Sequence, residues 1–342
     1  MRPWLPLLAA LALAACDSGG PRPALLDSRA PPGLAPRFLA PEGWAWGAVQ
    51  PPDGPELRYG VTAPPGTGRR AEVLILPDSG EPAEVWFETA AALNAAGYVV
   101  WTLEWEGFGG SGRPLPPYDM IHAQTAGAGA NAVAALISQV IRPGPDRPLT
   151  LMASGDSATV ALAALQGNAP VGAAILSAPR LTAAQSQTPW EGLAVRAGLS
   201  RLPSPDWRPW SRSDSAQAQP PGADPWRGRL IHSWRLANPD LRQSGQSLGW
   251  RATRSEAHAG GVPQLSMSRP LLILAAQAEG IATADTCRTE QGCRLAIQPQ
   301  FGSAPHLSLE AVRAAWLTEV TTFLGEQIPP AAPAARDHGG IE

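Results

Sequence analysis

The segment Pro148–Leu165 constrains the fold more than any other part of this 342-residue chain. It begins with a short apolar run, residues 149–153, and passes through Ser-Gly-Asp-Ser at residues 154–157 into a stretch rich in Ala and Leu. A short apolar run predicts a buried strand, and an Ala- and Leu-rich stretch is typical of a helix. We therefore predict a strand, a tight turn and a helix in immediate succession.

A turn of this kind is where a nucleophile elbow would lie. The central residue of an elbow has a strained backbone angle, and the residues two before and two after it must be small. Three registers are open: Gly155 between Ala153 and Ser157, Asp156 between Ser154 and Ala158, or Ser157 between Gly155 and Thr159. The third register is the poorest fit because Thr159 is β-branched.

Apolar runs alternate with helical stretches along most of the chain. Strands are predicted at residues 71–76, 98–103, 149–153, 172–176 and 271–275, with a hairpin-like segment after the last, and helices at 85–96, 125–141 and 308–324. Such alternation predicts an α/β fold, with a mostly parallel central sheet and helices on both faces. The core is expected to span residues 41–180 and 268–327.

An insertion at residues 181–267, after the sixth strand, differs from the rest in composition. It holds six tryptophans and no long strand-like run. Ligands of open α/β sheets bind at the carboxyl edge, so we predict that this insertion is a cap over that edge. The tryptophans could line an acyl pocket or could simply pack the cap helices.

The N-terminus is typical of a secreted lipoprotein. Arg2 precedes an apolar run that suits a signal peptide over residues 1–15, and Leu13-Ala14-Ala15-Cys16 resembles a bacterial lipobox. Acylated Cys16 would anchor the protein to the cell envelope, facing the periplasm, and Asp17 favours the inner membrane. Proline-rich residues 16–40 predict a tether, and residues 328–342 predict a disordered tail.

The charge and the histidine and cysteine content indicate which ligands and cross-links to expect. A formal net charge of -3 gives no electrostatic case for nucleic acid. The five histidines are scattered and no phosphate-binding glycine loop follows a predicted strand, so we expect no metal and no cofactor. Cys287 and Cys293 are the remaining cysteines, and in an oxidising compartment they predict a disulfide.

From about Leu57 to Glu326 the chain resembles the α/β-hydrolase family of bacterial lysophospholipases and monoacylglycerol lipases, grouped with the serine-aminopeptidase-like hydrolases. Residues 97–113 match the Gly-Tyr strand of that family and the Asp-x-Arg-Gly-His-Gly-x-Ser segment after it. Ser177-Ala178-Pro179 and Ala304-Pro305-His306 match as well. The resemblance implies a serine hydrolase that acts on small lipids or other carboxylic esters.

The residues aligned with the catalytic machinery depart from the pattern of this family. In the alignment the nucleophilic serine becomes Gly155, and the His-Gly of the oxyanion loop becomes Pro77-Asp78. An oxyanion site needs preorganised donors, whereas proline has no N–H and aspartate adds charge of the wrong sign. Glu279 takes the position of the catalytic acid and His306 that of the histidine.

Two hypotheses follow for the function. An active esterase would use a shifted Ser157 with His306 and Glu279, and a one-residue shift would instead make Asp156 an ester-forming nucleophile. Alternatively, the protein is a catalytically inactive relative that binds a ligand or a partner in the same cleft. The chemistry of the residues favours the inactive relative.

Overall fold

The fold is built on one eight-stranded sheet. The structure is a computed structural model, and it describes residues 20–65, 71–114, 116–123, 125, 127–167, 169–181, 188–259, 269–277, 287 and 292–327. The strands lie in the order β1-β2-β4-β3-β5-β6-β7-β8. Their bounds are β1 Ala45–Val49, β2 Leu57–Thr62, β3 Glu72–Leu76, β4 Val99–Leu103, β5 Leu149–Ser154, β6 Ala173–Ser177, β7 Leu271–Ala275 and β8 Cys293–Ile297.

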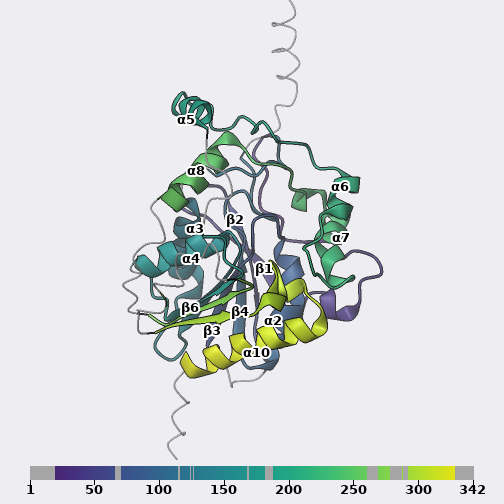
Figure 1. Cartoon of the computed structure of the whole chain (residues 1–342), viewed down its shortest axis with the longest axis vertical. Coiled ribbons are helices and arrows are strands. Elements are labelled where there is room, and N and C mark those ends of the chain that lie inside the picture. Colours follow the sequence, from purple (N-terminus) through teal and green to yellow (C-terminus); the bar gives the residue numbers. More distant parts are fainter. Residues whose placement is uncertain are drawn as a thin grey trace, which may run out of the picture.

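The sheet is parallel from β4 to β8, and the antiparallel hairpin of β1 and β2 extends it beside β4. Helices cover both faces, with α3 and α4 on one and α2 and α10 on the other (Figure 1). The described α-helices are α2 Phe87–Ala95, α3 Ala128–Leu136, α4 Ser157–Gln166, α5 Pro189–Arg196, α6 Arg212–Gln217, α7 Leu230–Ala237, α8 Leu248–Ala259 and α10 Glu310–Gln327. Short helical turns are η1 Pro36–Phe38, η2 Ala83–Trp86, η3 Ile137–Ile141, η4 Arg227–Arg229, η5 Pro239–Leu241, η6 Pro299–Phe301 and η7 Pro305–Leu307.

The predicted α/β architecture is confirmed, with two differences at its edges. The hairpin of β1 and β2 was not anticipated as a pair of strands. The hairpin-like segment predicted after β7 is wrong, because β8 pairs parallel with β7. A parallel pair needs a crossover of a dozen or more residues, and residues 276–292 supply that length.

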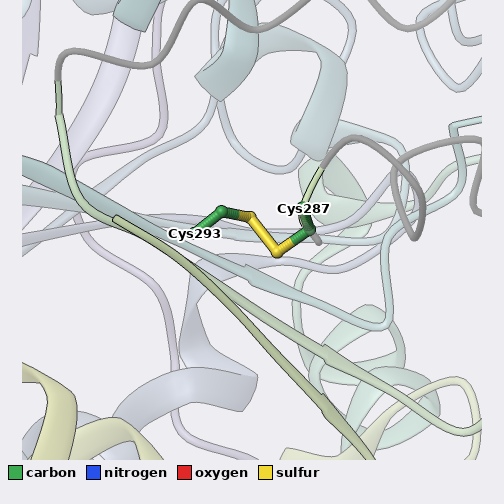
Figure 2. Close-up of a disulfide and its surroundings, with 2 residues drawn as sticks. All are labelled: Cys287 and Cys293. Atoms are coloured by element: carbon green, nitrogen blue, oxygen red, sulfur yellow. A yellow bond between two sulfur atoms is a disulfide. The ribbon is translucent and has the colours of Figure 1, made fainter. Parts of the chain in front are cut away.

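The predicted disulfide is present between Cys287 and Cys293, with an S–S distance of 2.06 Å (Figure 2). Cys287 is buried and belongs to the core cluster on the α3 and α4 side of the sheet. In the chain-entropy model a loop this short stabilises the fold by about 2 kcal/mol. The bond therefore restrains mainly the segment that leads into β8.

Residues 20–38 form an N-terminal strap that packs on the body of the protein. Arg22 of the strap and Arg113 pair as an antiparallel β-bridge, in which the backbone N–H of each donates to the carbonyl of the other. The Asn238 side chain accepts the N–H of Arg29 at 2.7 Å and donates to the carbonyl oxygen of the same residue at 2.9 Å. At its end, Phe38 is 2% exposed. The prediction of a tether over residues 16–40 did not anticipate these contacts of residues 20–38, because proline content reports backbone stiffness and not tertiary contacts.

The insertion between β6 and β7 is helical and carries α5 to α8. Among its tryptophans, Trp234 and Trp250 are buried, whereas Trp190 and Trp226 are 54% and 66% exposed. Trp250 packs against Trp105 from the loop after β4, with ring centroids 5.3 Å apart. Packing thus accounts for the two buried rings. No helix in the part of the chain described here combines the length and apolarity needed to span a bilayer.

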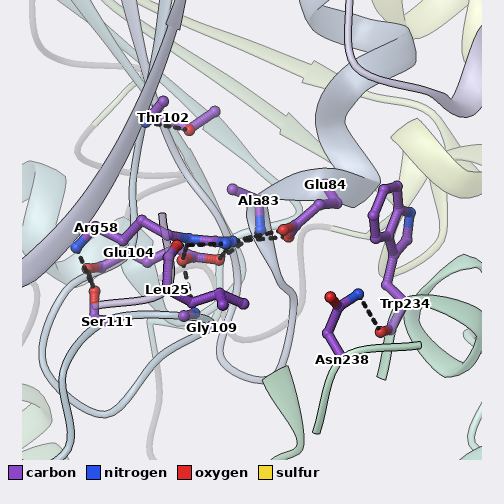
Figure 3. A network of polar contacts seen from close by, with 12 residues as sticks. Leu25, Arg58, Ala83, Glu84, Thr102, Glu104, Gly109, Ser111, Trp234 and Asn238 are labelled. Carbon is purple, nitrogen blue, oxygen red and sulfur yellow. Dashed lines mark hydrogen bonds and ion pairs between the residues drawn. The ribbon is translucent and has the colours of Figure 1, made fainter. Parts of the chain in front are cut away.

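A fully buried arginine joins the strap to the sheet (Figure 3). Arg58 of β2 is 0% exposed and bonds Glu104 through Nε at 2.6 Å and Glu84 through Nη2 at 2.8 Å. Glu104 also accepts the N–H groups of Ala83 and Gly110, and the guanidinium donates to the carbonyl of Leu25 in the strap. Although burial lowers the pKa of Arg58, the two carboxylates outweigh it and raise that pKa.

Replacing this arginine should be costly. In Arg58→Met two buried carboxylates lose their countercharge, which costs about 3–5 kcal/mol of unfolding free energy. The control is Arg294→Met, since Arg294 pairs with a half-exposed Glu326, and such pairs contribute less than about 1 kcal/mol. Urea unfolding of both variants measures the difference. Equal stability of the two variants would contradict the assigned role of Arg58.

Candidate active site

The turn between β5 and α4 has the geometry of an elbow, with Gly155 at its centre. Gly155 has a φ of +52°, the left-handed region that glycine enters at little cost. The turn is tied to the end of β6 and to the segment after it, because Gly155 donates its N–H to the carbonyl of Ser177 and its own carbonyl accepts the N–H of Arg180. The position that a catalytic serine would occupy at this elbow therefore carries no side chain.

The space above Gly155 is filled by the side chain of Asp78. A Cβ built on Gly155 would lie 2.2 Å from both Cγ and Oδ1 of Asp78, far inside van der Waals contact. Asp78 lies in the loop that follows β3, beside Pro77. The carboxyl group of Asp78 thus takes the place of the nucleophile side chain, and any residue larger than glycine at position 155 would displace it.

The same carboxyl group binds the backbone donors of the elbow. Asp78 Oδ1 accepts the N–H of Ser79 at 2.7 Å and the N–H of Asp156 at 2.8 Å. An oxyanion hole at such an elbow uses the N–H after the nucleophile and an N–H from the loop after β3, the positions held here by Asp156 and Ser79. The sequence predicted that N–H donors of the oxyanion hole would be missing. The structure instead places two N–H donors at the expected positions, and the Asp78 carboxyl group accepts both of them.

Two arginines close the site over these carboxylates. Arg180 donates from Nε to Asp156 Oδ1 at 2.8 Å and from Nη2 to Asp78 Oδ1. Arg254 of the cap helix α8 lies with Nη2 2.7 Å from Asp156 Oδ1. The Ser79 hydroxyl bonds the other Asp156 oxygen at 2.6 Å. These five residues, Asp78, Ser79, Asp156, Arg180 and Arg254, are called the elbow network below.

The network shields its carboxyl groups from solvent, and this alters their ionisation. The side chains of Asp78 and Asp156 are 11% and 5% exposed. Burial raises the pKa of Asp78 to about 6, because it outweighs the opposing effect of Arg180. Burial also acts to raise the pKa of Asp156, but hydrogen bonds and charges from Arg180 and Arg254 outweigh it and lower that pKa. At neutral pH two carboxylates therefore face two guanidinium groups in a closed site.

Ser157, the nucleophile of the active-esterase hypothesis, lies in the first turn of α4. Its side chain is fully buried, and its Oγ donates to the carbonyl of Pro77 at 2.6 Å. The same oxygen accepts the Trp105 Nε1–H at 3.3 Å. The hydroxyl joins α4 to the loop after β3, and its proton is directed at a backbone carbonyl.

His306 lies in η7, before the last helix, and contacts the loop after β3. Its ring is 2% exposed and stacks on Trp86 at a centroid distance of 3.9 Å, with Nε2 lying 3.3 Å from Glu81 Oε1. Glu81 Oε2 in turn accepts the N–H of Asp78 and the indole N–H of Trp86. His306 and Glu81 thereby hold the loop that carries Asp78. The structure places no hydrogen bond between His306 and Ser157 in the described part of the chain.

Two predicted site residues lie outside the described residues, Cys16 and Glu279. Sequence reasoning missed Arg180 and Arg254, since nothing distinguishes them from the other arginines of the chain. Arg180 follows the Ser-Ala-Pro match directly, and that proximity to the end of β6 is the one signal that could have drawn attention to it. No cluster of His, Cys, Asp and Glu that could hold a metal ion occurs among the residues described.

Comparison with known proteins places this site in a family. Residues 67–244 match the sequence model of serine aminopeptidase, S33. No curated protein matches the chain. Among solved structures, a soluble variant of monoglyceride lipase from Saccharomyces cerevisiae, in complex with a substrate analogue, is 16% identical. Its TM-score is 0.63, and the match covers 88% of this chain and 100% of that one.

A carboxyl esterase from Bacillus coagulans is 14% identical with a TM-score of 0.63, covering 84% of this chain and all of the other. An esterase from Thermogutta terrifontis is 15% identical with a TM-score of 0.56, covering 83% and 99%. At these identities the similarity establishes the fold, which is that of the α/β-hydrolases. The elbow and the loop after β3 thus lie where this fold builds its catalytic site.

The overlap between positions 78 and 155 predicts energetic coupling between them. Gly155→Ser should destabilise the protein by more than the 1–3 kcal/mol of left-handed backbone strain, because Asp78 must also move. Adding Asp78→Gly should recover part of the loss, with a coupling energy of about 1 kcal/mol or more. Unfolding free energies of the two single variants and the double variant give this coupling.

Gly222→Ser is the matched control for strain alone. Gly222 also has a positive φ, +76°, and a Cβ there would meet nothing within 4 Å. If Gly155→Ser costs no more than Gly222→Ser, or if the two substitutions are additive, Asp78 does not fill the space above Gly155.

Proposed function

Since this chain belongs to the serine aminopeptidase (S33) family of α/β-hydrolase-fold proteins, we propose that it is a member that does not hydrolyse esters. The observation that carries the proposal is the Asp78 carboxyl group, which fills the place of the nucleophile and takes both backbone donors of the elbow. The ligand class implied by the family resemblance, a small lipid or ester, would then be bound rather than cleaved.

Ester hydrolysis by this fold needs a nucleophile and a free oxyanion hole. Losing a single oxyanion donor costs about 10²- to 10³-fold in rate. Here a substrate oxygen would have to displace a carboxyl oxygen from both Ser79 and Asp156 while Arg180 holds that carboxyl group in place. Gly155 offers no atom that could attack the substrate carbonyl. The nucleophile and the free oxyanion hole are therefore both lacking at the elbow, where Asp78 lies against Gly155.

The alternative function is an esterase that uses Ser157, His306 and Glu279. It requires the Ser157 hydroxyl to leave the Pro77 carbonyl and to become exposed from a fully buried position. It also requires His306 to turn from Glu81 and Trp86 toward that serine. These rearrangements make the alternative less favourable than the non-hydrolytic function.

A fluorophosphonate activity probe distinguishes the two functions. The wild-type protein should show no labelling, because no serine at the elbow is activated by a histidine. An active serine hydrolase in the same reaction controls for the probe. Labelling of the wild type that disappears in Ser157→Ala and in His306→Ala would establish the esterase and overturn the proposal.

We propose further that acylated Cys16 anchors the protein to the envelope, facing the periplasm, with the inner membrane as the favoured site. The lipobox motif supports this anchor. The cap also exposes four large apolar side chains that are close together in the sequence: Trp190 54%, Leu193 68%, Leu199 46% and Leu202 47%. Where such side chains form a contiguous patch, the surface is typical of one that meets a membrane or a partner.

Anchoring predicts that the mature protein fractionates with membranes and carries acyl mass on Cys16. Cys16→Ser should release the protein from the membrane fraction or stall its processing. Fractionation with immunoblotting and mass spectrometry of the N-terminal peptide measure both effects. A wild-type protein that is soluble after signal removal, with unmodified Cys16, would rule out the anchor.

A further inference from the structure

A cavity separate from the elbow network lies where the N-terminal strap, the loop after β4 and the cap meet. Its volume is about 350 Å³, within the range of small-ligand sites, and none of its lining residues belongs to the elbow network. Arg22 of the strap, Arg113 and Tyr118 of the loop, and Trp210 and Arg242 of the cap lie on its wall. The docked strap thus forms part of the cavity wall, through Arg22 and Pro23.

Arg113 is a buried guanidinium without a carboxylate partner in the described part of the chain. It is 6% exposed and donates to the backbone carbonyls of Phe108, Gly109, Ser111 and Tyr118. Burial lowers its pKa to about 10, and the more distant carboxylates do not offset this effect. A buried cation with only neutral partners is stabilised by an anion placed beside it.

The two other arginines of the cavity lie on aromatic rings. The guanidinium carbon of Arg22 is 3.8 Å from the ring centroid of Tyr118, and that of Arg242 is 4.4 Å from the ring centroid of Trp210. Stacking of this kind limits the freedom of a guanidinium. Arg242 donates from Nε to the carbonyl of Arg235 at 3.2 Å, so its Nη groups are the ones that can meet a ligand. Arg242 makes no ion pair with any described residue. Its charge is therefore available to a ligand.

The acidic residues of the cavity are already engaged. Asp240 pairs with Arg22 at 3.2 Å, and Asp119 accepts the backbone N–H of Trp210 at 3.0 Å. Three arginines against these two aspartates leave one net positive charge in the cavity. The balance favours an anion over a cation.

We propose that this cavity binds a phosphate-bearing anion, held by the Arg242 guanidinium and stabilised by the positive charge of Arg113, whose N–H groups are mostly taken by backbone carbonyls. Guanidinium groups bind phosphate oxygens through paired, charge-assisted hydrogen bonds. The anion could be the headgroup of an acidic phospholipid or a free phosphate compound. The headgroup is favoured by the strap, because Tyr118 at the cavity donates to the carbonyl of Gly20, and the four-residue step from Gly20 back to Cys16 in the sequence has a maximum reach of about 14 Å. Only this choice of source rests on the proposed anchor.

The test uses the chain with Cys16→Ser, so that no acyl chain contributes to binding. Inorganic phosphate is titrated by calorimetry, and phosphatidylcholine vesicles with and without phosphatidylglycerol are used in flotation. Arg242→Gln should weaken binding by at least about fivefold, since it removes one charge-assisted contact. Arg229→Gln is the matched control, because Arg229 is exposed and lies outside the cavity.

The two sources give different results. Binding to phosphatidylglycerol vesicles with little affinity for phosphate identifies a lipid headgroup, whereas comparable affinity for phosphate identifies a soluble anion. Either result supports the site if Arg242→Gln weakens binding and Arg229→Gln does not. The proposal is overturned if neither probe binds, or if both substitutions weaken binding equally, as general surface charge would. The fluorophosphonate and fractionation results do not affect this outcome.

Discussion

The contact between the Asp78 carboxyl group and the turn at Gly155 determines how the rest of this site is built. Any Cβ at position 155 would overlap Asp78, so the glycine is required as long as the aspartate is present. Asp78 is in turn stable there because Ser79 and Asp156 offer it the N–H groups that a hydrolase reserves for an oxyanion. The glycine at the elbow and the aspartate in the loop after β3 are therefore linked, because a serine at position 155 would overlap Asp78 unless the aspartate were replaced as well.

Charge then connects this change to the surrounding elements. Arg180 joins Asp78 to Asp156, and Arg254 brings the cap helix α8 onto the same carboxylate. A mobile cap would have to break the Arg254 ion pair each time it opened, so the network favours a cap that stays closed over the elbow. On the opposite side of the loop after β3, Glu81 is held by His306 and Trp86. The histidine of the family thus has a supporting role in this structure, since it positions the loop that carries Asp78.

The sequence predicted the sheet and the register of the elbow because both depend on local patterns. Apolar runs mark the parallel strands β3 to β7, although not β8, and the match from Pro148 to Leu162 places Gly155 at the turn without the help of distant residues. The position of the Asp78 side chain could not be predicted, since it depends on contacts with residues about 80 and 100 positions away in the chain, as the spacing to Asp156 and Arg180 shows. The packing of the strap could not be predicted for the same reason. Its contacts with Arg113 and Asn238 join residues far apart in the chain, and the composition of the strap does not indicate them.

The amide proton of Asp156 reports most directly on the Asp78 carboxyl group. In protein labelled with ¹⁵N-aspartate, its chemical shift should titrate with a midpoint near the Asp78 pKa of about 6, because ionisation of Asp78 strengthens the hydrogen bond that this amide donates. Asp78→Asn should abolish that titration while the protein stays folded, since the asparagine oxygen still accepts the bond but does not ionise. An Asp156 amide that is insensitive both to pH in this range and to Asp78→Asn would contradict the account, because the donors of the elbow would then be free.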